Sequence, residues 1–218
     1  MHAAVDERTA AVIVEPVQGL AGAFDLATDF LRAARQACDR HDALLILDEV
    51  QTGMGRLGAP FGADLYRVMP DLLTTAKGIA GGFPCGALLM TPTIAKEFKP
   101  GQLGTTFGGG PVACAAVVAT VDAIEQERLI DNVRELSAVI RETCIVGPVH
   151  GVQGQGFLLG LKTTPPAAKV RDALLARNIL TGTSTDAHVL RLLPPLVLER
   201  AHVELLAAAL KELAHETL

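Results

Sequence analysis

The sequence lacks the features that mark several classes of protein. It has no basic excess, because 19 Lys and Arg residues stand against 24 Asp and Glu residues and leave a net charge of −5. Nucleic-acid binders neutralise phosphates with clustered Lys and Arg, so that class is excluded. No apolar run approaches the roughly 20 residues that span a bilayer, and residues 1–10 show no apolar core of a secretory signal. We therefore expect a cytoplasmic protein without nucleic-acid or membrane partners.

Paired cysteines are lacking as well. Cys38, Cys85, Cys114 and Cys144 form no C-x-x-C motif and have no His partners at metal-ligand spacing, so we expect reduced, mostly buried thiols and no metal site. What the chain does have is apolar content. With 50% hydrophobic and 20% charged residues it is not disordered. At about 150 residues per domain, its length predicts one to two domains with a real core.

Apolar runs alternate with helical patterns from the start of the chain. The sequence predicts strands over 10–14, 43–47, 72–75 and 86–90, and a helix over 28–40 whose buried stripe includes Phe30. The run 43–47 is apolar at every position, which is typical of a parallel strand covered on both faces. The alternation predicts an α/β domain with a mainly parallel sheet and flanking helices.

The pattern changes after Pro111. An Ala- and Val-rich helix from there to about Glu127 can join two domains, and a second helical pattern ends at the Gly-Pro pair 147–148. Beyond this point we expect a smaller α+β unit with strands over 157–161 and 188–192, a helix over 167–177 and a terminal helix. The expected domains are therefore 1–127 and 128–218.

Two residues follow predicted strands where ligands bind in α/β sheets. Asp48 stands directly after the apolar run 43–47, and an acidic residue there is either a ligand group or a helix cap. Lys77 follows the strand 72–75 and precedes small and apolar residues. Such surroundings would lower the pKa of the amine and make it a nucleophile for an aldehyde, whereas a solvated loop lysine would have no such role.

Two further features are open to more than one interpretation. The segment 104–110 carries hydroxyls and glycines before a predicted helix, which suits a phosphate but also describes a flexible linker. Arg191 lies in an otherwise apolar strand and needs an anionic partner. That partner is a substrate carboxylate, bound through two parallel hydrogen bonds, or a carboxylate of the protein itself.

Together these segments resemble the class III pyridoxal-phosphate-dependent aminotransferases, and within them the acetylornithine and ornithine group. The motifs occur in family order over nearly the whole chain. The matching stretches are Val14–Gly19, Leu47–Arg56, Pro70–Gly78, Gly81–Gly86, Thr105–Gly109 with Pro111, and Leu190–Pro195. The resemblance implies the type I fold of this enzyme class, a large domain with a mainly parallel sheet and a smaller C-terminal domain.

The resemblance also implies roles around pyridoxal 5'-phosphate. Lys77 would form the internal aldimine and, once displaced by substrate, move a proton between Cα and C4′ of the cofactor. Asp48 would pair with the pyridinium nitrogen and keep it protonated, so that the ring can accept electrons. Val50 would pack on the ring, Gln51 would hydrogen-bond the ring hydroxyl, and Glu49 is expected among the cofactor-binding residues.

The remaining roles concern the phosphate and the substrates. Thr106 would reach the phosphate of the neighbouring subunit's cofactor in a homodimer with shared active sites, and Thr105 would face substrate. Arg191 would hold the substrate α-carboxylate, and Glu15 would line the site near the cofactor. The implied reaction moves an amino group from an N-acetylornithine- or ornithine-like ω-amine to 2-oxoglutarate, in arginine biosynthesis.

The chain departs from the family pattern at several positions. Leu20 replaces a Glu that, in ornithine-type enzymes, neutralises the carboxylate-binding arginine, so Arg191 loses that partner here. Gly110 replaces an Asn, and Gln153 replaces an Arg. The motif around Glu15 normally comes midway through the polypeptide, so we expect this chain to correspond to the C-terminal half of such an enzyme, with unpaired sheet edges and apolar faces where the rest belongs.

Three other functions compete with this interpretation. A 4-aminobutyrate-type or other ω-aminotransferase shares the cofactor motifs. A non-catalytic half-enzyme, surviving as a partner subunit or remnant, would share the sequence without the activity. An ATPase would use the Asp-Glu pair at 48–49 to hold magnesium, but it also requires a G-x-x-x-x-G-K-[ST] loop, which the sequence lacks around Lys77.

Overall fold

The computed structural model describes residues 4–216. By its internal contacts the chain forms two compact units. The first comprises Met1–Pro16, Leu26–Met54 and Ala59–Glu127, and the second comprises Val17–Asp25, Gly55–Gly58 and Arg128–Leu218. Two short segments, 17–25 and 55–58, thus belong with the C-terminal part of the chain, although the sequence suggested a single boundary after Glu127.

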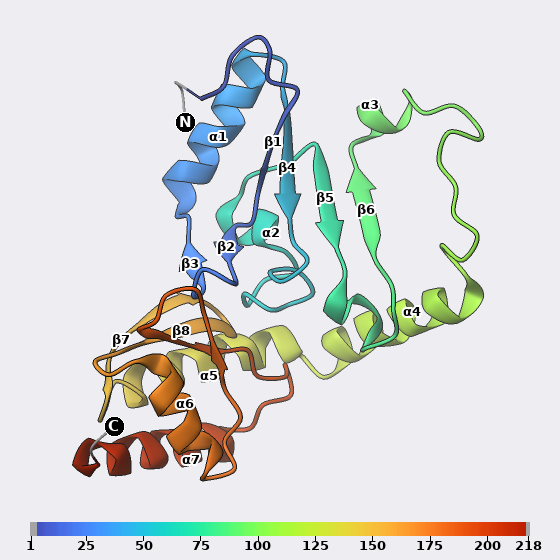
Figure 1. The fold of residues 1–218 in the computed structure, drawn as a ribbon. Coiled ribbons are helices and arrows are strands. Elements are labelled where there is room, and N and C mark those ends of the chain that lie inside the picture. The colour runs from blue at the N-terminus through green and yellow to red at the C-terminus, as the bar shows by residue number, and fades with distance from the viewer. Residues whose placement is uncertain (1–3, 217–218) are drawn as a thin grey trace. The chain divides into compact units, whose positions relative to one another are not determined.

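The first unit is built on a four-stranded sheet of order β1-β4-β5-β6 (Figure 1). The strands β1, β4 and β5 are parallel, and β6 is antiparallel to β5. Its elements are β1 (Ala11–Val14), α1 (Thr28–Arg40), β4 (Leu44–Asp48), α2 (Gly62–Tyr66), β5 (Leu72–Thr75), the 3₁₀ helix η1 (Lys77–Ala80), β6 (Ala87–Met90), α3 (Pro92–Ala95) and α4 (Pro111–Gln126). The α/β prediction and the predicted helix over 28–40 are confirmed.

One face of this sheet is covered and the other is not. Helix α1 packs beside β1 and β4, and its buried residues are Leu31, Ala34, Ala37 and Cys38. On the covered face Leu45 and Leu47 are fully buried. Phe30 was expected on the buried stripe of α1, but in the first turn of the helix it is 37% exposed.

The opposite face, here called the open sheet face, carries Ile13, Ile46, Leu72, Leu88 and Met90. Strand register places one residue from each strand in a row across it: Ile13 pairs with Ile46, Ile46 with Leu72, and Leu72 with Met90. Ile13 is 60% and Leu88 49% exposed, and the other three are only partly buried. The expectation that β4 is covered on both faces is therefore wrong for the described residues, in which α1 packs on one face and Ile46 on the other face stays partly exposed.

The second unit is built on an antiparallel sheet of order β7-β8-β10-β9. Its elements are β2 (Val17–Gln18), β3 (Phe24–Asp25), α5 (Leu129–Thr143), β7 (Val149–Gln155), β8 (Leu158–Thr163), α6 (Ala167–Leu175), β9 (Gly182–Thr183), β10 (Val189–Leu192), α7 (Arg200–Glu212) and the 3₁₀ helix η2 (Leu213–His215). Central strand β8 and helices α5, α6 and α7 supply most of one apolar core, with Phe157, Leu161, Leu174 and Leu210 at 0% exposure.

A close backbone approach explains why the segment Gly55–Gly58 belongs to the second unit. The amide of Phe157 donates to the carbonyl of Arg56 over 2.8 Å. At Gly156, φ is +53°, and a Cβ atom would lie 2.4 Å from that same carbonyl oxygen. Only glycine permits both the left-handed backbone and this contact.

The four cysteines differ in how deeply they are buried. Cys38 and Cys144 are buried, Cys85 is half-buried and Cys114 is exposed, so the predicted free thiols are confirmed but only two of them lie inside. Burial raises the pKa of Cys38 and Cys144 above that of an ordinary thiol. None of the helices in residues 4–216 has the length and apolar character needed to cross a membrane.

Candidate active site

Three adjacent parallel strands of the first unit end at the same edge of the sheet. Strand β1 runs into Glu15, β4 ends with Asp48, and β5 leads through Ala76 to Lys77. Val14 pairs with Leu47, and Asp48 pairs with Thr74, so the three chain segments leave the sheet side by side. This is the edge of an α/β sheet at which ligands bind.

Asp48 is held in place by its neighbours and keeps one oxygen available. Its Oδ1 accepts hydrogen bonds from the amide of Val50 over 3.1 Å and from the hydroxyl of Thr74 over 3.2 Å. Among the described residues the hydrogen bonds to Asp48 involve Oδ1 alone, which leaves Oδ2 as an acceptor for a bound group. Asp48 shares the open side of the sheet with Thr74 and Leu88, since the three are in register.

Thr74 is a site residue that sequence reasoning missed. Its hydroxyl fixes the Asp48 carboxylate from the neighbouring strand. The signal that identifies it is the strand register, which pairs Asp48 with Thr74 and is absent from a linear motif. Because it engages Oδ1, Thr74 directs the second carboxylate oxygen rather than competing for it.

Lys77 has an unusual backbone conformation. Its φ is +49°, in the left-handed region, and it begins the 3₁₀ helix η1. For a residue other than glycine this region costs about 1–2 kcal/mol, and such strain clusters at functional sites. The sequence predicted apolar surroundings for Lys77, but the residue is exposed, because Ile79 and Ala80 occupy the buried positions of η1.

Glu49 has both carboxylate oxygens engaged inside the protein. It is fully buried, and its Oε2 accepts from the Gly62 amide over 2.6 Å and the Thr52 hydroxyl over 2.8 Å. Its Oε1 accepts from the Ala63 amide over 2.7 Å. Burial raises the pKa of Glu49, and the two amides and the hydroxyl oppose that shift. With both oxygens engaged inside the protein, the structure does not support the expected contact of Glu49 with a cofactor.

Glu49 instead anchors the loop that carries two predicted site residues. Val50 and Gln51 follow it, are half-buried and lie in the turn closed by a 3.0 Å hydrogen bond from the Gly53 amide to the Glu49 carbonyl. The same residue therefore fixes both the start of this loop, through its backbone, and the start of α2, through its side chain.

The predicted phosphate-binding segment does not lie against the sheet. Residues 101–109, which include Thr105 and Thr106, are all exposed, and Phe107 is 91% exposed. Figure 1 shows the chain between α3 and α4 running clear of the four strands. This segment ends at Gly110, the residue before α4, as the sequence predicted.

Arg191 lies in the second unit, on β10, where its side chain meets only neutral groups. Its Nε donates to the Thr183 carbonyl over 2.7 Å and its Nη1 to the Gly19 carbonyl over 3.3 Å. None of the ion pairs in the described part of the chain involves Arg191, so its charge has no counter-ion there. Within the described residues of the second unit, Arg191 therefore forms no structural ion pair.

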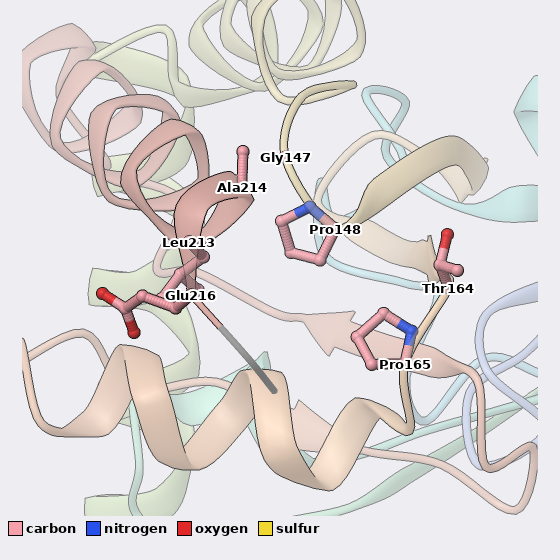
Figure 2. A pocket seen from close by; sticks show the side chains of 7 residues that line it. All are labelled: Gly147, Pro148, Thr164, Pro165, Leu213, Ala214 and Glu216. Carbon is pink, nitrogen blue, oxygen red and sulfur yellow. The ribbon is translucent and has the colours of Figure 1, made fainter.

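A pocket in the second unit is lined by none of these residues (Figure 2). It is lined by Gly147, Pro148, Thr164, Pro165, Leu213, Ala214 and Glu216. Its only carboxylate, Glu216, is already paired with Arg177. Among these described lining residues there is no cationic side chain and the one hydroxyl is that of Thr164.

Comparison with known proteins decides the family. Residues 1–214 match the family described as aminotransferase class-III. The chain belongs to the class III aminotransferases. It is 42% identical to the acetylornithine aminotransferase of Neisseria meningitidis serogroup A over 91% of this chain and 52% of that enzyme, and 38% identical to that of Methanocaldococcus jannaschii over 98% and 54%.

Solved structures give the same result for the fold. The acetylornithine aminotransferase of Elizabethkingia anophelis matches with a TM-score of 0.85 and 31% identity over 94% of this chain and 56% of that one. The ornithine aminotransferase of Toxoplasma gondii matches with a TM-score of 0.87 and 30% identity, over 96% and 52%. The fold is the type I fold of pyridoxal-phosphate-dependent transferases. The chain thus spans about half the length of the class III relatives it matches, as their C-terminal part.

The residues at the sheet edge fit the family's cofactor, pyridoxal 5'-phosphate, in part. Asp48 offers a free carboxylate oxygen for a ring nitrogen, and Lys77 offers an accessible amine one strand away. Thr105 and Thr106 are exposed in a segment that runs clear of the sheet, so the described residues at the sheet edge offer groups suited to the ring but few suited to the phosphate.

Proposed function

We propose that this chain is part of an aminotransferase that moves an amino group from an N-acetylornithine- or ornithine-like ω-amine to 2-oxoglutarate. The observation that carries the proposal is the placement of Lys77 and Asp48 after two adjacent, in-register parallel strands. The names of the relatives support this donor class, and the reaction would serve arginine biosynthesis. The remaining half of the catalytic machinery corresponds to the part of the relatives that this chain does not match.

Two residues would perform the central chemistry. Pyridoxal phosphate, when bound, supplies an aldehyde that reacts with amines and a ring that accepts electrons. Lys77 would hold the aldehyde carbon until a substrate amine displaces it, and would then move a proton between the substrate Cα and C4′. Oδ2 of Asp48 would accept the hydrogen bond of the ring nitrogen and favour its protonated form.

The other predicted residues would bind and orient. Val50 would pack on the ring and Gln51 would hydrogen-bond the ring hydroxyl, both positioned by the loop that Glu49 anchors. Thr106 would reach the phosphate of a neighbouring subunit's cofactor in a homodimer, and Thr105 would face substrate.

Two residues would contact or border the substrates. Arg191 would bind the α-carboxylate, which would supply the counter-ion that the described residues do not. Glu15 would line the site, because it follows the strand next to Asp48.

The test asks whether Lys77 is the lysine that reacts with pyridoxal phosphate. The chain is assembled with the N-terminal half of the Neisseria meningitidis enzyme and pyridoxal phosphate, reduced with borohydride and digested, and the labelled peptide is identified. We expect the label on Lys77, and its loss in Lys77→Ala. Lys96→Ala is the matched control, since Lys96 is an exposed lysine of the same unit. A label on another lysine, or identical absorbance spectra for the wild type and Lys77→Ala, would overturn the assignment.

A non-catalytic half-enzyme is the second candidate, and one observation favours it. The exposed segment 101–109 supplies few of the contacts that a phosphate needs within this chain. We therefore expect the isolated chain to bind pyridoxal phosphate weakly in equilibrium dialysis. Tight stoichiometric binding would contradict the view that this chain is half of a site. A complex with the N-terminal half that binds the cofactor but transfers no amino group would support the non-catalytic alternative.

A different ω-amine donor, such as 4-aminobutyrate, is the third candidate. The observation behind it is Leu20, which is 62% exposed and stands where ornithine-type enzymes carry a glutamate. Comparing turnover of N-acetylornithine, ornithine and 4-aminobutyrate by the assembled enzyme separates these donors.

A further inference from the structure

A row of residues crosses the outer face of the sheet in the second unit, which is the face turned away from the apolar core. Strand register pairs Gln153 of β7 with Gly160 of β8, and Gly160 with Arg191 of β10. Leu159 and Leu190, the chain neighbours of Gly160 and Arg191, belong to the core. Side chains alternate along a strand, and paired residues share a face, so the row lies on the opposite face. Two polar side chains thus flank a glycine there.

The loop between β2 and β3, residues 19–23, lies on this row. Nε2 of Gln153 donates to the Gly22 carbonyl over 2.8 Å. A Cβ atom on Gly160 would lie 2.3 Å from that same carbonyl oxygen, far closer than van der Waals contact. The glycine in the row therefore lets the 19–23 loop lie directly on the sheet, and the Gln153 amide holds it there.

The first residue of the loop orients Arg191. Nη1 of Arg191 donates to the Gly19 carbonyl over 3.3 Å, while its Nε donates to the Thr183 carbonyl over 2.7 Å. The Gly19 carbonyl also accepts the Gly22 amide over 3.3 Å. Gly22 is the residue that Gln153 holds, so a continuous set of hydrogen bonds runs from the Gln153 amide to the Arg191 guanidinium.

The middle of the loop is held through its backbone. The side chain of Leu20 is 62% exposed, and its carbonyl accepts the Thr185 amide over 3.0 Å. This hydrogen bond exists only while the loop lies on the sheet. Protection of the Thr185 amide from exchange therefore reports the position of the loop.

We propose that Gln153 is a positioning residue for Arg191. By holding Gly22 it fixes the Gly19 carbonyl, and that carbonyl fixes Nη1. None of the hydrogen bonds in residues 4–216 uses Nη2 of Arg191. Nη2 and the second hydrogen of Nη1 thus form the edge at which a guanidinium takes a carboxylate through two parallel hydrogen bonds. The inference rests on the proposed function, in which Arg191 binds the substrate α-carboxylate.

The first test uses this chain alone and needs no amino transfer. In Gln153→Met the side chain keeps its length and loses its donor. We expect the Thr185 amide to exchange about two- to tenfold faster, which is the effect of losing one net hydrogen bond. Phenylglyoxal, which reacts with guanidinium Nη groups, should modify Arg191 faster by a similar factor, because Nη1 loses its fixed acceptor. Mass spectrometry measures both rates.

The matched control is Gln155→Met, the same substitution two residues further along β7. Nε2 of Gln155 donates to Oδ2 of Asp25 over 2.8 Å, in β3 and outside the 19–23 loop. This variant should change neither the exchange of Thr185 nor the modification of Arg191. Exchange of the β8 amides measures the stability of the whole unit and should be the same in both variants. Equal effects of the two substitutions, or β8 exchange accelerated as much as that of Thr185, would overturn the proposal.

The second test measures substrate affinity in the chain assembled with the N-terminal half of the Neisseria meningitidis enzyme. Gln153→Met should raise KM for 2-oxoglutarate about two- to tenfold and change kcat by less than about twofold, because a misaligned Arg191 weakens carboxylate binding. Gln155→Met should change neither constant. The same KM in the wild type and in Gln153→Met would contradict the positioning role. An assembled enzyme that transfers no amino group counts against the proposed function, while Thr185 exchange and Arg191 modification still decide whether Gln153 positions the guanidinium.

Discussion

Glu49 shows how a buried side chain can matter to a site that it does not touch. Its carboxylate accepts from the Gly62 and Ala63 amides and the Thr52 hydroxyl. In Glu49→Gln the new amide group would face a backbone N–H donor, and an unsatisfied buried donor costs about 1–3 kcal/mol. We expect that loss in the free energy of unfolding by urea, with no change for the exposed control Glu142→Gln. Equal stabilities of the two variants would contradict the anchoring role.

The same residue gives a pH dependence with a defined sign. Burial raises the pKa of Glu49 above its ordinary value of 4.5, so the folded protein binds more protons than the unfolded chain just above that pH. The free energy of unfolding contributed by this group therefore falls as pH rises through that interval. Urea titrations at several pH values should show this slope in the wild type and in Glu142→Gln but not in Glu49→Gln.

Arg191 gives a prediction about substrate affinity. Its Nη1 donates to the carbonyl of Gly19, the residue next to Leu20, and its partners in the described part of the chain are neutral carbonyls. Leu20→Glu would place a carboxylate beside the guanidinium and compete with a substrate carboxylate. We expect a KM for the amino donor several-fold higher, with a small change in kcat, in the assembled enzyme. Leu20→Gln, which lacks the charge, should not raise KM, and a similar increase in both variants would rule out charge as the cause.

At the scale of elements, one hydrogen-bonded group holds α1 on the sheet. Arg35 of α1 contacts Asp71 over 2.7 Å, and the same Asp71 oxygen accepts the amide of Leu45 in β4 over 2.7 Å. Asp71→Asn should lower the free energy of unfolding by about 1–3 kcal/mol, because it weakens two bonds at once. Asp39→Asn removes the other, 61% exposed, partner of Arg35 and should cost less than about 1 kcal/mol. Equal losses of unfolding free energy in Asp71→Asn and Asp39→Asn would show that the hydrogen bond from the Leu45 amide to Asp71 does not add to stability.

Several elements and their site residues could be predicted from the sequence because their side chains follow a clear period. The helix over 28–40 and the strand over 72–75 have the same bounds as α1 and β5. Strand β7 was missed, since Gly151, Gln153 and Gly154 interrupt its apolar alternation. Asp48 and Lys77 could be recognised because they lie at or just after the ends of strands.

The partners of these residues depend on the register of neighbouring strands and on loop closure, which no local pattern contains. Thr74 could not be identified as the partner of Asp48 without the pairing of β4 with β5. Glu49 could not be recognised as the anchor of the 50–62 loop, because the Gly62 and Ala63 amides come to it only when that loop closes.

At the scale of the whole molecule, the apolar residues are found in two places, a core and an exposed sheet face. The 50% hydrophobic residues predicted a real core, and the second unit has one, formed by its own residues. The first unit places part of its apolar residues on the open sheet face instead. The predicted unpaired edges and apolar faces are confirmed there. Composition alone could not have shown which apolar residues are buried in a core and which lie on an exposed sheet face.

This difference predicts unequal local stability of the two units. Strand β8 lies between β7 and β10, and its residues Leu158, Leu159 and Leu161 are fully buried, so its amides open only when that core unfolds. Strand β4 also has two neighbours, but one of its faces is open, and less apolar burial opposes its opening. In the chain alone, hydrogen exchange followed by mass spectrometry should therefore be slower for β8 than for β4. Addition of the N-terminal half of a relative should slow exchange in β4 and leave exchange in β8 unchanged. Equal exchange rates in β4 and β8 of the chain alone would show that the open sheet face does not limit the stability of the first unit.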